Sequence, residues 1–153
     1  MTDHHRLVRP LDASTPAPVW PTGVSLAGFA LRDVPAIHGL LERAYARGGG
    51  SVQSLDLWWP AVAADSEFDP ELCIVAKDAE GTIVGFALVW SSAFIKDLVV
   101  DPSWHRRGLG TAILHEIFRR LAAREHSSVA LKVMMDNPSG AERLYRHLGF
   151  VDG

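Results

Sequence analysis

The stretch LVVDPSWHRRGLGTAIL, residues 98–114, decides how this chain is expected to fold. It begins as a short apolar strand, passes through a turn that contains Gly108 and Gly110, and continues as a long amphipathic helix. The glycines let the backbone approach a ligand without a Cβ atom in the way, and the free N–H groups at a helix start attract an anion. Arg106 and Arg107 add positive charge. We therefore predict a phosphate-binding turn, with a purely structural glycine turn as the alternative.

Two common phosphate-binding motifs do not fit this turn. A dinucleotide fingerprint needs a glycine or alanine three positions after Gly110, where this chain has Ile113, and an acidic residue about 20 positions later at a strand end. A P-loop needs a Lys-Ser or Lys-Thr pair after its glycines, which is absent here. The turn therefore belongs to a different class of phosphate site, if it is one.

Around this stretch, apolar residues recur with the spacing of helices and strands. Asp33 is placed to cap a first helix, which a run of three glycines at 48–50 ends. A second helix contains Pro60, and its Trp58 and Trp59 cannot both face one core. We interpret both tryptophans as packing anchors, with a groove wall as the alternative for one of them. The expected order is strand, two helices, three strands, helix, strand and helix, over residues 24–31, 34–45, 55–64, 72–77, 82–92, 93–100, 108–121, 129–135 and 137–148.

The composition fits one soluble globular domain, with 48% hydrophobic and 22% charged residues in a chain of 153. Cys73 is the single cysteine, so there is no intrachain disulfide, and we interpret it as a small core residue. The formal net charge of -3 argues against nonspecific nucleic-acid binding. No apolar run approaches the roughly 20 residues of a membrane span, and the N-terminus lacks the apolar core of a signal peptide. We expect a cytoplasmic protein that uses neither nucleic acid nor membrane as a partner.

Residues 1–23 differ from the rest because four prolines lie among alanine, serine and threonine, with Trp20 as the one large aromatic residue. Proline fixes φ without forbidding extended packing, so this segment is expected to be an extended arm, either disordered or draped over the domain. The domain itself is expected to occupy residues 24–153.

Two segments together resemble one protein family. The window HRRGLG, residues 105–110, is similar to the acetyl-CoA-binding signature of the GNAT superfamily of N-acetyltransferases, although His105 stands where the family has Arg or Gln. The segment MMDNPSGAERLYRHLGF, residues 134–150, resembles the family's late strand-helix element, with its Asn, Ala, Leu-Tyr and Gly-Phe in place. The resemblance covers roughly residues 24–150.

The resemblance implies a GNAT fold of the mixed α/β (α+β) class, in which helices flank a mostly antiparallel sheet with one splayed strand pair. Acetyl-CoA would be the co-substrate, with no metal, and would lie where the strand ending at Val100 parts from the strand ending at Met135. Its pantetheine arm would pair with the first strand, and its pyrophosphate would meet the N–H groups of the turn. The residues expected to bind it are Leu98, Val99, Val100, His105, Arg106, Arg107, Gly108, Leu109, Gly110, Thr111 and Asn137.

The implied reaction is direct transfer of the acetyl group to a primary amine in a ternary complex, so no covalent intermediate on Cys73 is needed. The amine must lose a proton. Asp97, the carboxylate inside the central strand, is expected to accept it through a water or to anchor a cationic substrate, with a structural ion pair as the alternative. Tyr145 is expected to protonate the CoA thiolate, with core packing as the alternative. A GNAT-like module that binds CoA or a protein without useful catalysis is the competing function.

The acceptor is expected to be a small-molecule or peptide amine. The family usually continues past the Gly-Phe pair into one or two more strands, whereas this chain stops three residues later at Gly153. We therefore expect the strand at 129–135 to be covered either by a second subunit, as a homodimer, or by the proline-rich arm folded into the gap.

Overall fold

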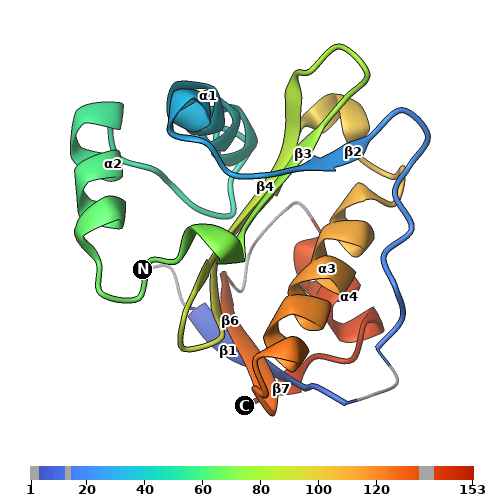
Figure 1. The fold of residues 1–153 in the computed structure, drawn as a ribbon. Helices are drawn as coiled ribbons and strands as arrows, with labels where there is room; N and C mark the ends of the chain where they lie inside the picture. The colour runs from blue at the N-terminus through green and yellow to red at the C-terminus, as the bar shows by residue number, and fades with distance from the viewer. Residues whose placement is uncertain (1–3, 13–14, 135–139) are drawn as a thin grey trace.

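A sheet that helices cover on both faces runs through the computed structural model, which describes residues 4–12, 15–134 and 140–153 (Figure 1). The helices are α1 (Val34–Tyr45), α2 (Leu55–Ala64), α3 (Leu109–Ala123) and α4 (Ala141–His147), with single 3-10 turns at Leu31–Asp33, Pro70–Leu72 and Pro102–Trp104. The strands are β1 (His4–Pro10), β2 (Ser25–Ala27), β3 (Cys73–Lys77), β4 (Ile83–Trp90), β5 (Phe94–Val100), β6 (Ser128–Met134) and β7 (Val151–Asp152).

The seven strands follow the order β2-β3-β4-β5-β6-β1-β7. Neighbouring strands are antiparallel, except for β5 and β6, which are parallel and are joined only at Phe94 with Ala130 and Ile95 with Leu131. Beyond these two pairs, the described parts of β5 and β6 diverge. The expected fold class is confirmed, including the splayed strand pair.

Apolar side chains on both faces of the sheet explain why the strands read as near-continuous hydrophobic runs. On one face α1 buries Ile37, Leu40 and Leu41 against β3, β4 and β5. On the other face α3 buries its apolar stripe, including Ile113 and Phe118, both 0% exposed. Each such side chain, if fully buried, contributes about 1.5–3 kcal/mol of hydrophobic free energy. β5 is thereby fixed between two packed layers.

Both tryptophans of α2 are packing anchors, as we expected. Trp58 is 7% exposed and its ring lies 5.6 Å from that of His38, between centroids. The ring centroid of Trp59 lies 5.8 Å from that of Phe29 and 5.6 Å from that of Phe68. Such ring pairs stabilise the attachment of a short helix through their buried area and edge-to-face geometry.

Of the two forms expected for the N-terminal arm, the structure has the packed one. His4–Pro10 form strand β1, which pairs with β6 along its full length. Of the two coverings that we expected for this strand, the structure has the arm; the homodimer stays a prediction. Leu7 is fully buried, and β7 adds to the outer side of β1. Arg9 donates from Nε to the carbonyl oxygen of Leu148 at 2.7 Å, and its guanidinium carbon lies 4.2 Å from the centroid of the Phe118 ring. β1 is therefore anchored to both α3 and α4.

Among the helices that the structure describes, none combines the length and the apolar composition that crossing a membrane requires.

Candidate active site

A cleft of about 650 Å³ opens where β5 and β6 part. Its walls come from the second half of β5, the turn that leads into α3, the end of β6, the start of α4 and the end of α1 with the glycines that follow it. The lining residues are Ala44, Tyr45, Arg47, Gly48, Gly49, Ile95, Lys96, Leu98, Val99, Val100, Trp104, His105, Arg106, Gly108, Leu109, Gly110, Thr111, Leu131, Lys132, Val133, Gly140, Ala141, Leu144 and Tyr145.

The turn before α3 has the geometry of an open helix start. Gly108 is the N-cap residue with φ 85°, in the left-handed region that glycine occupies without strain, and no side chain caps the helix there. A Cβ atom added to Gly108 would meet nothing within 4 Å. The N–H groups of the first turn of α3 therefore begin at the wall of the cleft, where they and the helix dipole favour an anion.

Asp101 stabilises the segment that leads into this turn and is not among the residues that line the cleft. Its Oδ1 accepts from the N–H and hydroxyl of Ser103 at 3.0 and 2.8 Å, and its Oδ2 accepts from Arg43 at 3.1 Å. Burial alone would raise the pKa of Asp101, but these hydrogen bonds outweigh it and lower the pKa. Asp101 therefore stays ionised and fixes the turn.

The backbone of β5 directs some of its polar groups away from β4 and toward the cleft. Asp101 donates its N–H to the carbonyl oxygen of Val84 on β4, and Val99 lies opposite Phe86 two positions earlier. Because backbone groups alternate in direction along a strand, those of Val99 face β4 whereas those of Leu98 and Val100 face the cleft. An extended amide chain can pair with these two residues as an added strand would.

The predicted cofactor residues mostly meet in one place. His105 and Arg106 line the cleft beside the glycine turn, with Arg106 in the left-handed region at φ 62°. Arg107 is not among the lining residues, and its guanidinium carbon lies 4.8 Å from the centroid of the Trp104 ring. Asn137 lies outside the described residues.

Asp97 is buried on the face of the sheet that α1 covers. Asp97 pairs opposite Leu88 of β4, in the same regular register that sets Val99 opposite Phe86, and so lies on the side of the core beneath α1. Its Oδ1 accepts from the hydroxyl of Tyr45 at 2.5 Å, and its Oδ2 lies 3.9 Å from the Nζ of Lys96. Burial raises the pKa of Asp97, although Lys96 and the Tyr45 hydrogen bond oppose this.

Tyr45 is a site residue that the sequence pattern did not reveal. It belongs to the apolar stripe of α1, and its partner Asp97 is 52 positions away, so no local signal joins the two. The ring lines the cleft, and burial together with the charge of Asp97 raises the pKa of Tyr45 far above its ordinary value. Its hydroxyl stays protonated.

Tyr145 is both a packing residue and a cleft residue. It is 9% exposed, and its ring centroid lies 5.6 Å from that of Phe150. The same side chain lines the cleft, and no described residue hydrogen-bonds to its hydroxyl. Burial raises the pKa of Tyr145 to about 12, so the hydroxyl is a proton donor at neutral pH.

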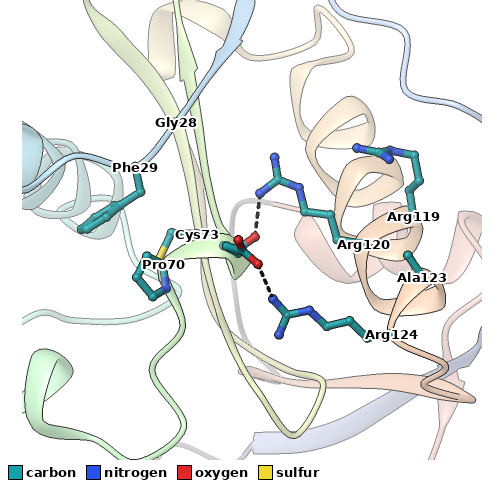
Figure 2. Close-up of a pocket in the computed structure, with 9 residues that line it drawn as sticks. Gly28, Phe29, Pro70, Cys73, Arg119, Arg120, Ala123 and Arg124 are labelled. Carbon is teal, nitrogen blue, oxygen red and sulfur yellow. Dashed lines mark hydrogen bonds and ion pairs between the residues drawn. The ribbon is translucent and has the colours of Figure 1, made fainter.

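A second hollow, of about 480 Å³, lies beside the C-terminal half of α3 (Figure 2). Arg119, Arg120 and Arg124 give it positive charge, but each is engaged by carboxylates of Glu116, Asp69 or Glu71. Cys73 lies at its base, and burial raises the pKa of this thiol to about 12. The hollow therefore offers neither a free cation nor a thiolate, and Cys73 is a core residue as expected.

In the described part of the chain, no group of three His, Cys, Asp or Glu side chains is placed to hold a metal.

Comparison with known proteins agrees with this geometry. The sequence profile of the Acetyltransferase (GNAT) family matches residues 35–150. A mycothiol acetyltransferase from Clavibacter sepedonicus is 35% identical over 86% of this chain and 44% of its own length. A streptothricin acetyltransferase from Streptomyces lavendulae is 31% identical over 92% of this chain and 73% of its own length. This chain thus spans less than half of the first relative.

A solved structure shows the same arrangement of elements. The crystal structure of a GCN5-related N-acetyltransferase from Sphaerobacter thermophilus superposes with a TM-score of 0.85 at 30% identity, over 99% of this chain and 49% of that one. The fold is therefore shared over nearly the whole of this chain.

Proposed function

Because the chain belongs to the GNAT acetyltransferase family, we propose that it moves the acetyl group of acetyl-CoA to a primary amine by direct attack in a ternary complex. The observation that carries this proposal is the cleft itself. It combines the backbone groups of Leu98 and Val100, which face away from β4, with the open helix start at Gly108, at the point where β5 and β6 part. An amide chain and a pyrophosphate are the two ligand parts that this arrangement suits.

The residues of the cleft fit acetyl-CoA by their chemistry. The N–H groups from Leu109 to Thr111 would hold the pyrophosphate, with Arg106 and His105 beside them. The N–H of Leu98 or Val100 would donate to the thioester oxygen as negative charge develops on it. Tyr145 would donate a hydrogen bond to the departing thiolate. Since its pKa of about 12 lies above the ordinary thiol value of about 8.5, Tyr145 would stabilise the thiolate through this hydrogen bond and keep its own proton.

The acceptor is proposed to be a small-molecule amine. Relatives named for mycothiol and for streptothricin support this choice. The amine must lose a proton before or during attack, and Asp97 is the proposed acceptor of that proton, since burial raises its pKa toward the range of a useful base.

Calorimetry with acetyl-CoA followed by a turnover assay on a panel of primary amines tests the proposal. We expect saturable binding and amide formation on at least one amine, seen as release of free thiol and as a mass increase of the product. Binding without turnover on a broad panel would instead favour the CoA-binding module.

Gly108→Ala is expected to weaken acetyl-CoA binding roughly tenfold, about 1.4 kcal/mol, because the added methyl group occupies open space at the proposed pyrophosphate site. The matched control is Gly81→Ala in the turn between β3 and β4. Gly81 has φ 84°, and a Cβ there also meets nothing within 4 Å. Both substitutions carry a similar backbone cost of about 1 kcal/mol. Equal affinities in the two variants would contradict the assignment of the turn.

A further inference from the structure

Tyr45 connects the cleft with the buried carboxylate of Asp97, because it lines the cleft and its hydroxyl donates to Asp97. Tyr45 is among the residues that line the cleft, whereas Asp97 is not. Only 7% of the Asp97 side chain is exposed. Of these two residues, Tyr45 is therefore the one that an amine in the cleft can reach.

From this juxtaposition we infer that Tyr45 is a catalytic residue that relays the proton of the acceptor amine to Asp97. The inference rests on the proposed function and names a group that passes the proton. It replaces the water that the sequence alone suggested between the amine and Asp97.

The hydrogen bond between the two side chains has the direction that a relay needs. An ionised carboxylate only accepts hydrogen bonds, so in the 2.5 Å contact the Tyr45 hydroxyl donates to Oδ1 of Asp97. Within the part of the chain that the structure describes, no group donates to the phenol oxygen, so its lone pairs can accept a proton from a donor in the cleft. Short hydrogen bonds to a charged acceptor are the strong ones, which holds the hydroxyl in this orientation.

The surroundings fix both partners. Tyr45 is the last residue of α1, and α1 packs against β4 and β5. Among the described residues, the charged group that interacts with the pair is Lys96, 3.9 Å from the other carboxylate oxygen. The titratable Tyr145 nearby is neutral at neutral pH, because burial raises its pKa to about 12. Lys96 is half exposed, so it compensates the carboxylate only in part.

The proposed step balances in protons and electrons without a further reactant. An amine nitrogen that has attacked the thioester gives up one proton to the oxygen of Tyr45, while Tyr45 gives its own proton to the carboxylate of Asp97. The nitrogen becomes a neutral amide, Asp97 becomes a neutral acid, the carbon–sulfur bond breaks with its electron pair on sulfur, and Tyr45 ends as it began. Because the pKa of Tyr45 lies far above its ordinary value, a free tyrosinate does not form and the two transfers are coupled.

The test compares Tyr45→Phe, Asp97→Asn and the double variant with the unaltered protein. Tyr45→Phe keeps the ring and removes only the hydroxyl. Each single change is expected to lower kcat/KM about 100-fold, as loss of general-base catalysis does, and the double variant is expected to lose no more than either single variant. Acetyl-CoA affinity by calorimetry and the melting temperature check that the fold of each variant persists.

The pH profile separates a relay from a structural role. In the unaltered protein, activity is expected to fall as pH drops through the raised pKa of Asp97, because the carboxylate must be ionised to take the proton. Both single variants are expected to lose this part of the profile, while the part due to the amine's own ionisation persists. Turnover in Tyr45→Phe with the profile unchanged would overturn the relay alone. An unaltered protein that binds acetyl-CoA and acetylates no amine would overturn the proposed function as well.

Discussion

Leu7→Asp is expected to leave a chain with no cooperative unfolding transition at 25 °C. Leu7 is 0% exposed at the centre of β1, so the change removes a buried leucine and places a charge in the core. Removing a buried leucine side chain alone costs about 2–5 kcal/mol, and an unpaired buried charge costs several more. The whole stability of a domain is about 5–15 kcal/mol. Urea titration followed by tryptophan fluorescence measures the effect.

Val19→Asp is the matched control for this experiment. Val19 lies in the same proline-rich segment but is 82% exposed, so the same chemical change is expected to alter the free energy of unfolding by less than about 0.5 kcal/mol. If Leu7→Asp and Val19→Asp unfold at the same urea concentration, β1 does not belong to the sheet.

Tyr145→Phe is expected to lower kcat about 100-fold while leaving the affinity for acetyl-CoA within a factor of two or three, a loss of about 2.7 kcal/mol from the transition state alone. The phenyl ring retains the contact with Phe150, so packing is kept and only the hydroxyl is lost. The hydroxyl is protonated at neutral pH because burial raises its pKa to about 12, and a thiolate that forms beside it is the group that gains from the hydrogen bond.

Single-turnover kinetics and calorimetry together check this prediction. A variant that retains full turnover would leave Tyr145 as a packing residue, the alternative that its place in the apolar stripe of α4 suggests. A variant that loses turnover and acetyl-CoA affinity in equal measure would show a binding role instead.

The elements that the sequence predicted well are those with long periodic patterns. The stripe of α3, the first long helix and the strands from Cys73 to Val100 all follow from local spacing. The cap expected from Asp33 was wrong, because its side chain makes no cap hydrogen bond and instead lies 3.4 Å from the Nζ of Lys77. β1 and β7 were missed, because one lies in a proline-rich segment and the other has two residues. Each is a strand only because a partner far along the chain provides its hydrogen bonds.

In the candidate site, too, the features that lie within one stretch of sequence were predictable and the long-range contact was not. The glycine turn and the backbone of β5 were predictable, since both lie in one continuous stretch. The role of Tyr45 was not, because its contact with Asp97 joins α1 to β5. Local sequence also does not distinguish Arg106 from Arg107. The structure does distinguish them. Arg106 has a positive φ and lines the cleft, whereas Arg107 lies over the Trp104 ring and is not a lining residue.

From the position of β1 between β6 and β7 we expect its pairing to be a late step in folding. Strands β3, β4 and β5 are joined by short connections, so they can pair as soon as they are made. The side chain of Arg9 must instead wait for Leu148, 139 positions further along. Contacts of such long range close slowly because the loop entropy is lost before the contact forms. Until β1 docks, one edge of β6 is bare, and that interval is when the folding chain is most open to pairing with another copy of itself.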